Sequence, residues 1–338
     1  VDDDGKADFD NIQAAVDAAS DGDEIIVMPG TYTSTQDGHV VNMLGKAVTL
    51  RSSDPSDPDV VTATIIDGEN TRRGLACFNN EISVTIIDGF TIINGYSSID
   101  FDYGDLWDVS WEDGLGGGMV NYESSPTIQN CVFQGNDAFG KGGGVYNYGS
   151  SPTFTSCTFE NNYAGYKGGG MALHDWKWGT DNIATLTNCN FKSNTSNTYG
   201  GGISSNQGRL TLIHCTLSHN TAESRGGGLY VGPYAQLIVI NNCTITSNTA
   251  ITEGGGGVST GGSVGCNFLD TTICGNIPNQ INGIWNDEGG NTVATICPVA
   301  GACCTNDNCL VSEQENCLAF FGQWQGEGTT CVENPCPT

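Results

Sequence analysis

The chain has 338 residues, and its 38 acidic against 11 basic side chains give a formal net charge of −27. Because phosphate binding needs a basic surface, this charge argues against a nucleic-acid partner. No hydrophobic run approaches the roughly 20 residues of a transmembrane helix, so we expect no transmembrane segment. The acidity agrees with a cation-rich extracellular setting and, equally well, with simple solubility.

The cysteine content bears on the compartment. Fifteen cysteines favour an oxidising environment. The first residue is Val1 rather than Met, which suggests a removed signal peptide, although another kind of chain boundary would look the same. We therefore expect a protein that is secreted, extracellular or on the cell surface.

The first ten residues are rich in aspartate around Gly5. Carboxylate oxygens at this spacing could hold a calcium ion, although the closing glutamate of an EF-hand loop is missing. The alternative is a solvated acidic end. The candidate calcium ligands here are Asp2, Asp4, Asp8 and Asp10.

A short helix is predicted next, because Phe9, Ile12, Ala15, Val16 and Ala19 fall on one helical face. Residues 23–32 then predict a strand and a turn. Together, residues 12–33 (IQAAVDAASDGDEIIVMPGTYT) closely resemble the N-terminal opening of secreted pectate-lyase-like β-helix proteins. That resemblance implies that the helix caps the open end of a solenoid and prevents edge pairing.

A three-part motif is then written six times: a Gly triplet, a cysteine, and an asparagine five residues after the cysteine. A fixed period of this size indicates stacked supersecondary units. The cysteine column is Cys131, Cys157, Cys189, Cys215 and Cys243, with Thr271 in sixth place, and the asparagine column is Asn136, Asn162, Asn194, Asn220, Asn248 and Asn276.

The spacing of the motif predicts one coil of a parallel β-helix per copy. Each cysteine precedes the next triplet by 11 residues, whereas the distance from triplet to cysteine varies from 15 to 21 residues. One arc is therefore fixed and the other tolerates insertion. At roughly 3.3 Å per residue, such a unit can form three short strands, each pairing with its copy about 4.8 Å away.

The side chains of the motif predict interior columns. Apolar residues stand three before and two after each cysteine, as Phe154 and Phe159 do around Cys157. We interpret the column cysteines as buried thiols that act as small hydrophobes, with stacked disulfides as the alternative. The asparagines are expected at a bend, where the amide can bond the turn and its copy in the next coil.

The motif also resembles the polymorphic outer-membrane-protein repeat: residues 133–136 (FQGN) match its FxxN half and residues 143–146 (GGVY) its GG[AVLI] half. This resemblance implies a right-handed β-helix but no particular activity, since adhesins, lyases and hydrolases share that scaffold. We predict an all-β fold, a right-handed single-stranded parallel β-helix of about eight coils with an N-terminal capping helix and a small disulfide-rich C-terminal module. The expected divisions are 1–60 for the cap and first strands, 61–297 for the β-helix and 298–338 for the module.

Two inserts interrupt the repeat, at about residues 97–115 and 174–181. Their aromatic and acidic side chains could stack sugars, coordinate calcium, or pack as a lid or against another subunit. The candidate calcium ligands are Asp100, Asp102, Asp105 and Asp108, and the candidate ligand or subunit contacts are Phe101, Tyr103, Trp107, Trp111, Trp176 and Trp178.

Cysteines also mark the C-terminal end. One disulfide is expected among Cys266, Cys274 and Cys297. The tail allows fifteen connectivities, and disulfides are favoured over zinc because the tail has no CxxC pair and no histidine. The candidate disulfide cysteines of the tail are Cys303, Cys304, Cys309, Cys317, Cys331 and Cys336.

The sequence singles out no catalytic residue. Its five arginines stand in no recognisable lyase motif, and no Ser/His/Asp order or metal-ligand spacing is evident. We therefore expect a secreted, calcium-stabilised structural or adhesive protein whose partner is itself, in a head-to-tail filament or surface layer, or a surface polysaccharide. The alternative is a carbohydrate-active enzyme, a lyase or glycoside hydrolase, or a carbohydrate-binding β-helix.

Overall fold

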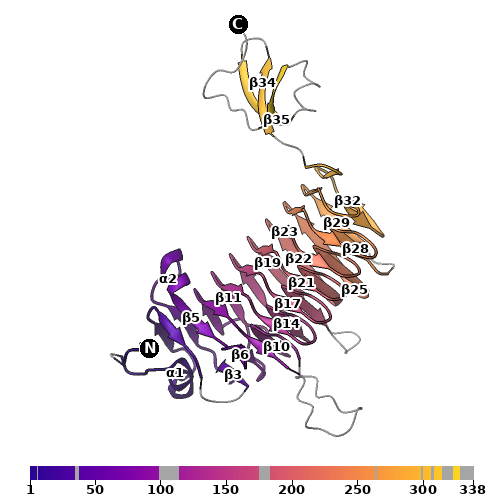
Figure 1. Ribbon diagram of the computed structural model, residues 1–338. Helices are drawn as coiled ribbons and strands as arrows, with labels where there is room; N and C mark the ends of the chain where they lie inside the picture. The colour runs from indigo at the N-terminus through magenta and orange to yellow at the C-terminus, as the bar shows by residue number, and fades with distance from the viewer. Residues whose placement is uncertain are drawn as a thin grey trace. The chain divides into compact units, whose positions relative to one another are not determined.

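The computed structural model describes residues 1–5, 7–34, 38–98, 114–174, 183–262 and 265–297, and the backbone of strands at 300–305, 308–313 and 323–327. The chain divides into two compact units, Val1–Val293 and Ala294–Thr338. The first unit is a parallel β-solenoid of about eight coils, which confirms the predicted fold class. Figure 1 shows its strands stacked along one axis in chain order.

One coil contains four short strands rather than the three expected from its length: β14 (Val145–Tyr148), β15 (Thr153–Thr155), β16 (Thr158–Glu160) and β17 (Tyr163–Ala164). The fourth is only two residues long and follows the asparagine bend. All four pair in parallel with their copies in the next coil. The bends, rather than the strands, therefore take up much of each unit.

Within the described residues the solenoid contains three parallel sheets. The first holds 17 strands and covers two sides of the coil. In addition to β14 and β15 it consists of β1 (Glu24–Val27), β3 (His39–Asn42), β4 (Thr49–Ser52), β6 (Arg73–Cys77), β7 (Ile86–Asp88), β10 (Met119–Tyr122), β11 (Thr127–Gln129), β18 (Met171–His174), β19 (Ile183–Thr187), β22 (Ile203–Ile213), β25 (Leu229–Asn241), β28 (Val258–Thr260), β29 (Cys266–Leu269), β31 (Ile281–Asn282) and β32 (Trp285–Asp287). In β22 and β25 the bend between the two sides is lost and one long strand replaces two.

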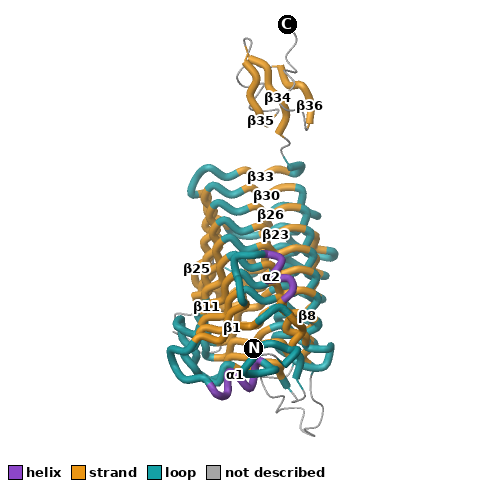
Figure 2. The backbone as a smooth tube through the Cα atoms, turned by 90° about the vertical axis from the view of Figure 1, so that its left-hand side faces the viewer, coloured by secondary structure: helices purple, strands orange, loops and turns teal. Residues whose placement is uncertain are grey.

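The other two sheets complete each coil, and Figure 2 shows the second one as a regular stack. The second sheet has ten strands: β16 with β2 (Gly30–Tyr32), β5 (Thr64–Asp67), β8 (Thr91–Ile93), β12 (Val132–Gln134), β20 (Asn190–Lys192), β23 (Thr216–Ser218), β26 (Thr244–Thr246), β30 (Thr272–Cys274) and β33 (Thr292–Ala294). The third has six: β17 with β9 (Tyr96–Ser97), β13 (Asp137–Ala138), β21 (Thr195–Ser196), β24 (Thr221–Ala222) and β27 (Thr249–Ala250).

The core consists of columns of like side chains, because in-register parallel strands place equivalent residues above one another. In the second sheet, the middle residue of each strand from β12 to β30 is buried. In the second sheet Phe133, Phe159 and Phe191 are fully buried and stack with ring centroids 5.1 and 4.3 Å apart. Each buried ring adds apolar burial that offsets the cost of ordering so many bends.

The cysteine column is a row of free, buried thiols: Cys131, Cys157, Cys189, Cys215 and Cys243. The Sγ atom of Cys189 lies 3.4 Å from the Thr187 carbonyl of its own coil and 3.6 Å from the Phe154 carbonyl of the preceding coil. In the sixth coil the Thr271 hydroxyl lies 3.0 Å from the equivalent Leu269 carbonyl. From Cys131 to Thr271 the position therefore holds a small side chain with one donor, whereas the preceding coil has the buried Phe90 opposite Cys131.

The asparagine column is a continuous hydrogen-bonded ladder. The Nδ2 atom of Asn162 donates to the Asn194 side-chain oxygen at 2.9 Å and to the Phe133 carbonyl at 2.9 Å. Both ends of the ladder are closed within the chain. At one end the Gly95 amide donates to Asn136, and at the other Gln280 accepts from Asn276 at 2.8 Å, in the place of a further asparagine.

The Gly triplets form the tight bend beside this ladder. The first glycine of each triplet has a positive φ, 71° at Gly142, which L side chains rarely adopt. The second approaches backbone directly: a Cβ on Gly143 would stand 2.2 Å from the Tyr163 carbonyl. The motif is therefore required by backbone geometry and not by flexibility.

Helix α1 (Ile12–Ala18) closes the first coil, as the N-terminal resemblance implies, and Figure 2 shows it at the end of the solenoid. Asn11 caps its N-terminus by accepting from the Ala14 amide at 2.8 Å. At its C-terminus the Lys46 ammonium donates to the carbonyls of Val16, Asp17 and Ala19 at 2.6–2.8 Å. Because the last carbonyls of a helix lack the full set of intrahelical partners, Lys46 both satisfies these groups and complements the helix dipole.

A second helix, α2 (Pro58–Ala63), was not predicted from the sequence. Its signals are local: Asp57 caps it and Pro58 stands at its first position. It lies against the second sheet, where the Thr91 hydroxyl donates to the Val61 carbonyl at 2.9 Å. In the described residues no helix is long and apolar enough to span a membrane.

The cysteines near the C-terminal end separate into two states. Cys274 and Cys297 form a disulfide, whereas Cys266 is a buried free thiol. The second unit contains a three-stranded antiparallel sheet, β34 (Ala300–Thr305), β35 (Asn308–Glu313) and β36 (Gln323–Glu327), in which β34 pairs with both others. The side chains of its cysteines lie outside the described residues, so their pairing stays a prediction: Cys303, Cys304, Cys309, Cys317, Cys331 and Cys336.

Candidate functional site

The insert residues singled out from the sequence lie outside the described residues: Asp100, Phe101, Asp102, Tyr103, Asp105, Trp107, Asp108, Trp111, Trp176 and Trp178. The N-terminal aspartates are described, and the Asp2 carboxylate accepts from the Asp4 amide at 3.4 Å. Within the described ranges, no group of three or more His, Cys, Asp or Glu side chains is placed to hold a metal ion. Calcium binding at Asp2, Asp4, Asp8 and Asp10 therefore stays a prediction.

A different set of side chains gathers where each coil turns from the third sheet into the Gly triplet. The residues before the first five triplets are joined in series by single β-bridges from one coil to the next. We call this row the corner column, and it consists of Leu115, Lys141, Lys167, Tyr199 and Arg225. Neighbouring members are about one inter-strand spacing apart, near 4.8 Å at the backbone.

Lys167 stands at the centre of an aromatic cluster on this corner. Its ammonium lies 4.7 Å from the ring centroid of Tyr166 and 5.1 Å from that of Tyr199. Tyr199 in turn stacks on Tyr230 of the next coil, with centroids 4.5 Å apart. The rings therefore position Lys167 by cation–π attraction while leaving ring edges and hydroxyls at the surface.

Exposed aromatic residues lie a few positions before the same lysines in the chain. Phe139 is 51% exposed, Tyr163 is 36% exposed and Tyr166 is 43% exposed. Of these, Tyr166 contacts Lys167 directly. Exposed rings are costly to keep in water, so three of them on the coils that carry the two lysines favour a contact surface.

The electrostatics of the corner column are unusual for so acidic a chain. Burial and the neighbouring charge of Lys167 lower the pKa of Lys141 to about 8. Burial also lowers the pKa of Lys167. Two rungs further on, Arg225 is neutralised by Glu253, whose carboxylate lies 2.6 Å from Arg225 Nη2.

A second aromatic row lies on the outward side of the adjoining strands. The rings of Tyr122 and Tyr148 stack at 4.7 Å, and Tyr148 is followed by His174 at 6.2 Å. Between this row and the corner column, Val120 and Tyr146 are almost completely buried although they belong to a separate, outward-facing cluster. The first side of the coil therefore presents two polar and aromatic rows over a packed floor.

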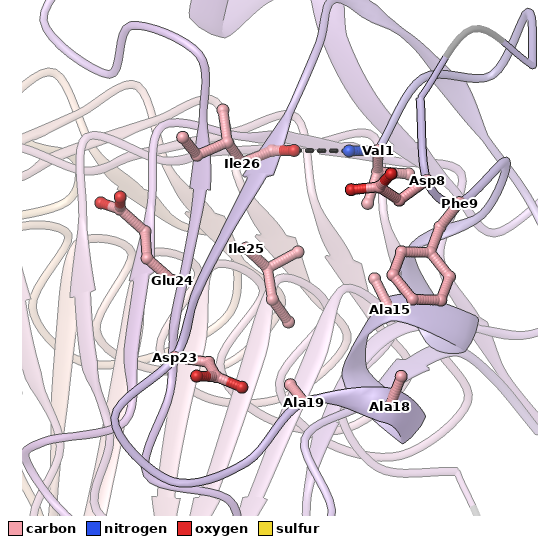
Figure 3. A pocket seen from close by; sticks show the side chains of 10 residues that line it. All are labelled: Val1, Asp8, Phe9, Ala15, Ala18, Ala19, Asp23, Glu24, Ile25 and Ile26. Carbon is pink, nitrogen blue, oxygen red and sulfur yellow. Dashed lines mark hydrogen bonds between the residues drawn. The ribbon is translucent and has the colours of Figure 1, made fainter.

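A cavity of about 490 Å³ lies at the N-terminal end, between α1 and β1 (Figure 3). Two carboxylates on its lining are already engaged: Asp23 accepts from the Ser20 amide at 2.7 Å, and Glu24 accepts from Arg51 at 2.6 Å. Its other lining residues are largely apolar, so the cavity marks the seam between cap and solenoid. The lining consists of Val1, Asp8, Phe9, Ala15, Ala18, Ala19, Asp23, Glu24, Ile25 and Ile26.

Comparison with known proteins supports the fold. Residues 56–217 match the family model described as "Right handed beta helix region". Together with the sheet topology, this match defines the chain as a right-handed parallel β-solenoid. A search of curated proteins finds no match.

Similar solved structures include pectate lyase Pel9A, with a TM-score of 0.40 and 14% identity, covering 85% of this chain and 62% of that one. Tailspike protein 2 of an Escherichia coli O157:H7 bacteriophage has a TM-score of 0.32 and 13% identity, covering 80% of this chain and 36% of that one. The chain thus spans less than two thirds of the length of either structure.

Proposed function

We propose that this protein is an extracellular, adhesive β-helix that binds a polysaccharide along its corner column. The observation that carries the proposal is Lys167, held against the exposed ring of Tyr166 and next to Lys141 on the neighbouring coil, with exposed Phe139 and Tyr163 a few residues earlier in the same coils. Aromatic faces pack against the apolar faces of sugar rings, and ammonium groups donate to sugar oxygens.

The scaffold suits such a ligand because it is rigid and repetitive. The corner residues sit on turns whose backbone is held by the asparagine ladder and the Gly triplets, so little conformational entropy is lost on binding. Equivalent positions recur at about 4.8 Å along the axis, which lets successive coils contact successive parts of one polymer. An extended ligand therefore gains affinity through many weak, aligned contacts.

A head-to-tail filament is less well supported than adhesion. Each interior ladder would have to continue across a junction between copies. The asparagine ladder instead ends on Gln280, and the cysteine column ends where the Thr271 amide donates to the Asn291 side chain at 2.9 Å. At the other end α1 covers the first coil.

The proposal is tested by polysaccharide co-sedimentation and glycan-array binding of the full chain. Replacement of both Phe139 and Tyr166 by alanine should lower binding by about ten-fold or more, because aromatic packing is worth roughly 0.5–1.5 kcal/mol per ring. The matched control is Tyr234→Ala, which removes an exposed tyrosine of β25 outside the corner column. Binding that the double variant leaves intact, or that Tyr234→Ala removes equally, would contradict the proposed site.

One observation favours a polysaccharide lyase as a second candidate. A lysine with a pKa of about 8, as at Lys141, is partly neutral near pH 8 and can accept a proton there. In an eliminating cleavage the base takes a proton from the sugar carbon, the electron pair forms a carbon–carbon double bond, and the glycosidic oxygen leaves. The test is the ultraviolet absorbance of unsaturated products, and binding without such products assigns the corner to adhesion alone.

A further inference from the structure

Three cations on this solenoid are neutralised by a carboxylate on the neighbouring coil: Arg51 by Glu24, Lys192 by Glu160, and Arg225 by Glu253, at 2.6 to 3.1 Å. Lys192 and Glu160 are direct in-register partners, whereas Arg51 lies opposite Ile26 and reaches Glu24 further along the same strand. Two other cations are satisfied within the chain in a different way, Lys46 by helix carbonyls and Arg72 by Glu69. The chain has 38 acidic residues available to form ion pairs.

Lys141 and Lys167 differ from these cations. They are joined by a β-bridge on adjacent coils, so the neighbouring coil gives each of them a like charge and not a carboxylate. Both are half-buried, and within the described ranges neither has a carboxylate partner. Burial lowers the pKa of both lysines, and for Lys141 the neighbouring charge of Lys167 lowers it further.

The rings around Lys167 offset only part of the cost of burying these two charges. Cation–π contacts with Tyr166 and Tyr199 stabilise one ammonium. They leave Lys141 without a comparable partner and do nothing for the repulsion between the two lysines. The position therefore favours a negative charge that the described part of the chain does not supply.

We propose that Lys141 and Lys167 together bind an anionic substituent, a carboxylate or sulfate group, carried by a sugar of the bound polysaccharide. This inference rests on the proposed function and names the ligand class of the same surface. The two ammonium groups stand on adjacent coils, and one carboxylate or sulfate has oxygens enough to accept from both. The exposed rings of Phe139, Tyr163 and Tyr166 then contact the sugar that carries the group.

The site needs no divalent cation, because the protein supplies the positive charge. An acidic polymer would otherwise be repelled by a chain of net charge −27. The lysine pair is therefore a local positive charge on an acidic protein, and it determines where an acidic polymer can approach. Screening by salt should weaken binding, since both charges are partly exposed.

The experiment compares two oligosaccharides of equal length, a uronic-acid oligosaccharide and its carboxyl-reduced neutral counterpart, by calorimetry with a chelator present. The wild type should bind the acidic one about ten-fold more tightly, the scale of one charge-assisted contact. Lys141→Gln and Lys167→Gln should each reduce that preference, and the double variant should bind the two oligosaccharides with equal affinity. Replacement of both by arginine should retain the preference, which controls for folding.

Lys192→Gln is the matched control, since it removes a lysine from a different sheet that is already paired with Glu160. Equal affinity of the wild type for both oligosaccharides would overturn the inference while leaving polysaccharide binding in place. Binding of neither would remove the proposed function as well. Binding of inorganic sulfate alone as tightly as the oligosaccharide would assign the pair to a free anion and overturn the glycan assignment.

Discussion

Asn162 and Asn194 stand on neighbouring coils, and the amide of the first donates to the oxygen of the second at 2.9 Å. The same Asn194 oxygen also accepts from the backbone amide of Asn162, at 3.1 Å. Each asparagine thus satisfies two donors of the coil before it. The ladder is a polar network that is fully buried and fully used.

Asn162→Ala should therefore be strongly destabilising. It leaves the Asn136 amide and the Phe133 carbonyl without side-chain partners, at about 1–3 kcal/mol for each buried group. Thermal and denaturant unfolding will measure the loss. Asn190→Ala, on an outward position of β20, is the control and should change stability by less than about 0.5 kcal/mol. Similar losses in both variants would show that the ladder adds little.

The glycines of a coil should differ sharply in tolerance. Gly143→Ala places a Cβ against two carbonyl oxygens, those of Tyr163 and Gly169, and should prevent normal stacking of the coil. Gly135→Ala meets no atom within 4 Å and should cost only the left-handed backbone penalty, about 1–2 kcal/mol. Soluble yield and melting temperature give the comparison. A Gly143→Ala variant as stable as Gly135→Ala would contradict the close approach described above.

The cysteine column should accept threonine better than alanine. Thr271 occupies the same place and bonds the equivalent carbonyl, so Cys189→Thr should remain within about 1.5 kcal/mol of wild type. Cys189→Ala loses the donor and leaves a small cavity, which costs more. Urea unfolding distinguishes them, and the reverse order would show that volume rather than hydrogen bonding governs the column.

Stability should fall in mild acid because of His39. Burial and Arg73 lower its pKa from 6.5 to about 4. In the unfolded chain the imidazole takes a proton near pH 6.5, so its contribution is complete above that pH and is lost as pH falls toward 4. The loss amounts to about 2–3 kcal/mol. His39→Phe should flatten the pH dependence of melting over this window, whereas His219→Asn, at an exposed turn, should not. Parallel curves for wild type and His39→Phe would contradict the assignment.

Ligand binding should have the opposite pH dependence. The charged form of Lys141 holds the anion, and its pKa is about 8, so affinity should decline as pH rises through 8. An ordinary lysine would hold its charge to about pH 10. If binding is measured from neutral pH to about 9.5, Lys141→Arg should show no decline within that range, because arginine keeps its charge. Calorimetric titration across that range will show it, and a wild-type profile that stays flat would exclude Lys141 as a contact.

The fold could be predicted from the sequence because the same residue types recur from coil to coil within one chain. Cys157 and Asn162 have copies at a constant offset, and stacking puts copies in contact. Helix α2 was missed because six residues carry too little periodicity, and only its cap signals remained. The fourth strand was missed because Tyr163–Ala164 is too short to show alternation.

The candidate site could not be found in the same way. Corner positions change from Leu115 to Lys141, Lys167 and Tyr199, so no repeated identity marks them. The signal was present only as a position, the residue before each Gly triplet. The corner residues form a candidate site only because residues one coil apart in the sequence lie side by side in the structure. Only the arginines were considered as possible bases, and the lysines were not.

Gln280 has a consequence for how such a chain changes in evolution. It completes the asparagine ladder from inside the last coil, just as α1 closes the first, so neither terminus depends on how many coils lie between. Adjacent ladder residues Asn136 and Asn162 are 26 positions apart, and a duplication or loss of that length preserves every hydrogen-bond partner. The length of the solenoid can thus change in whole coils without disturbing either of its closed ends.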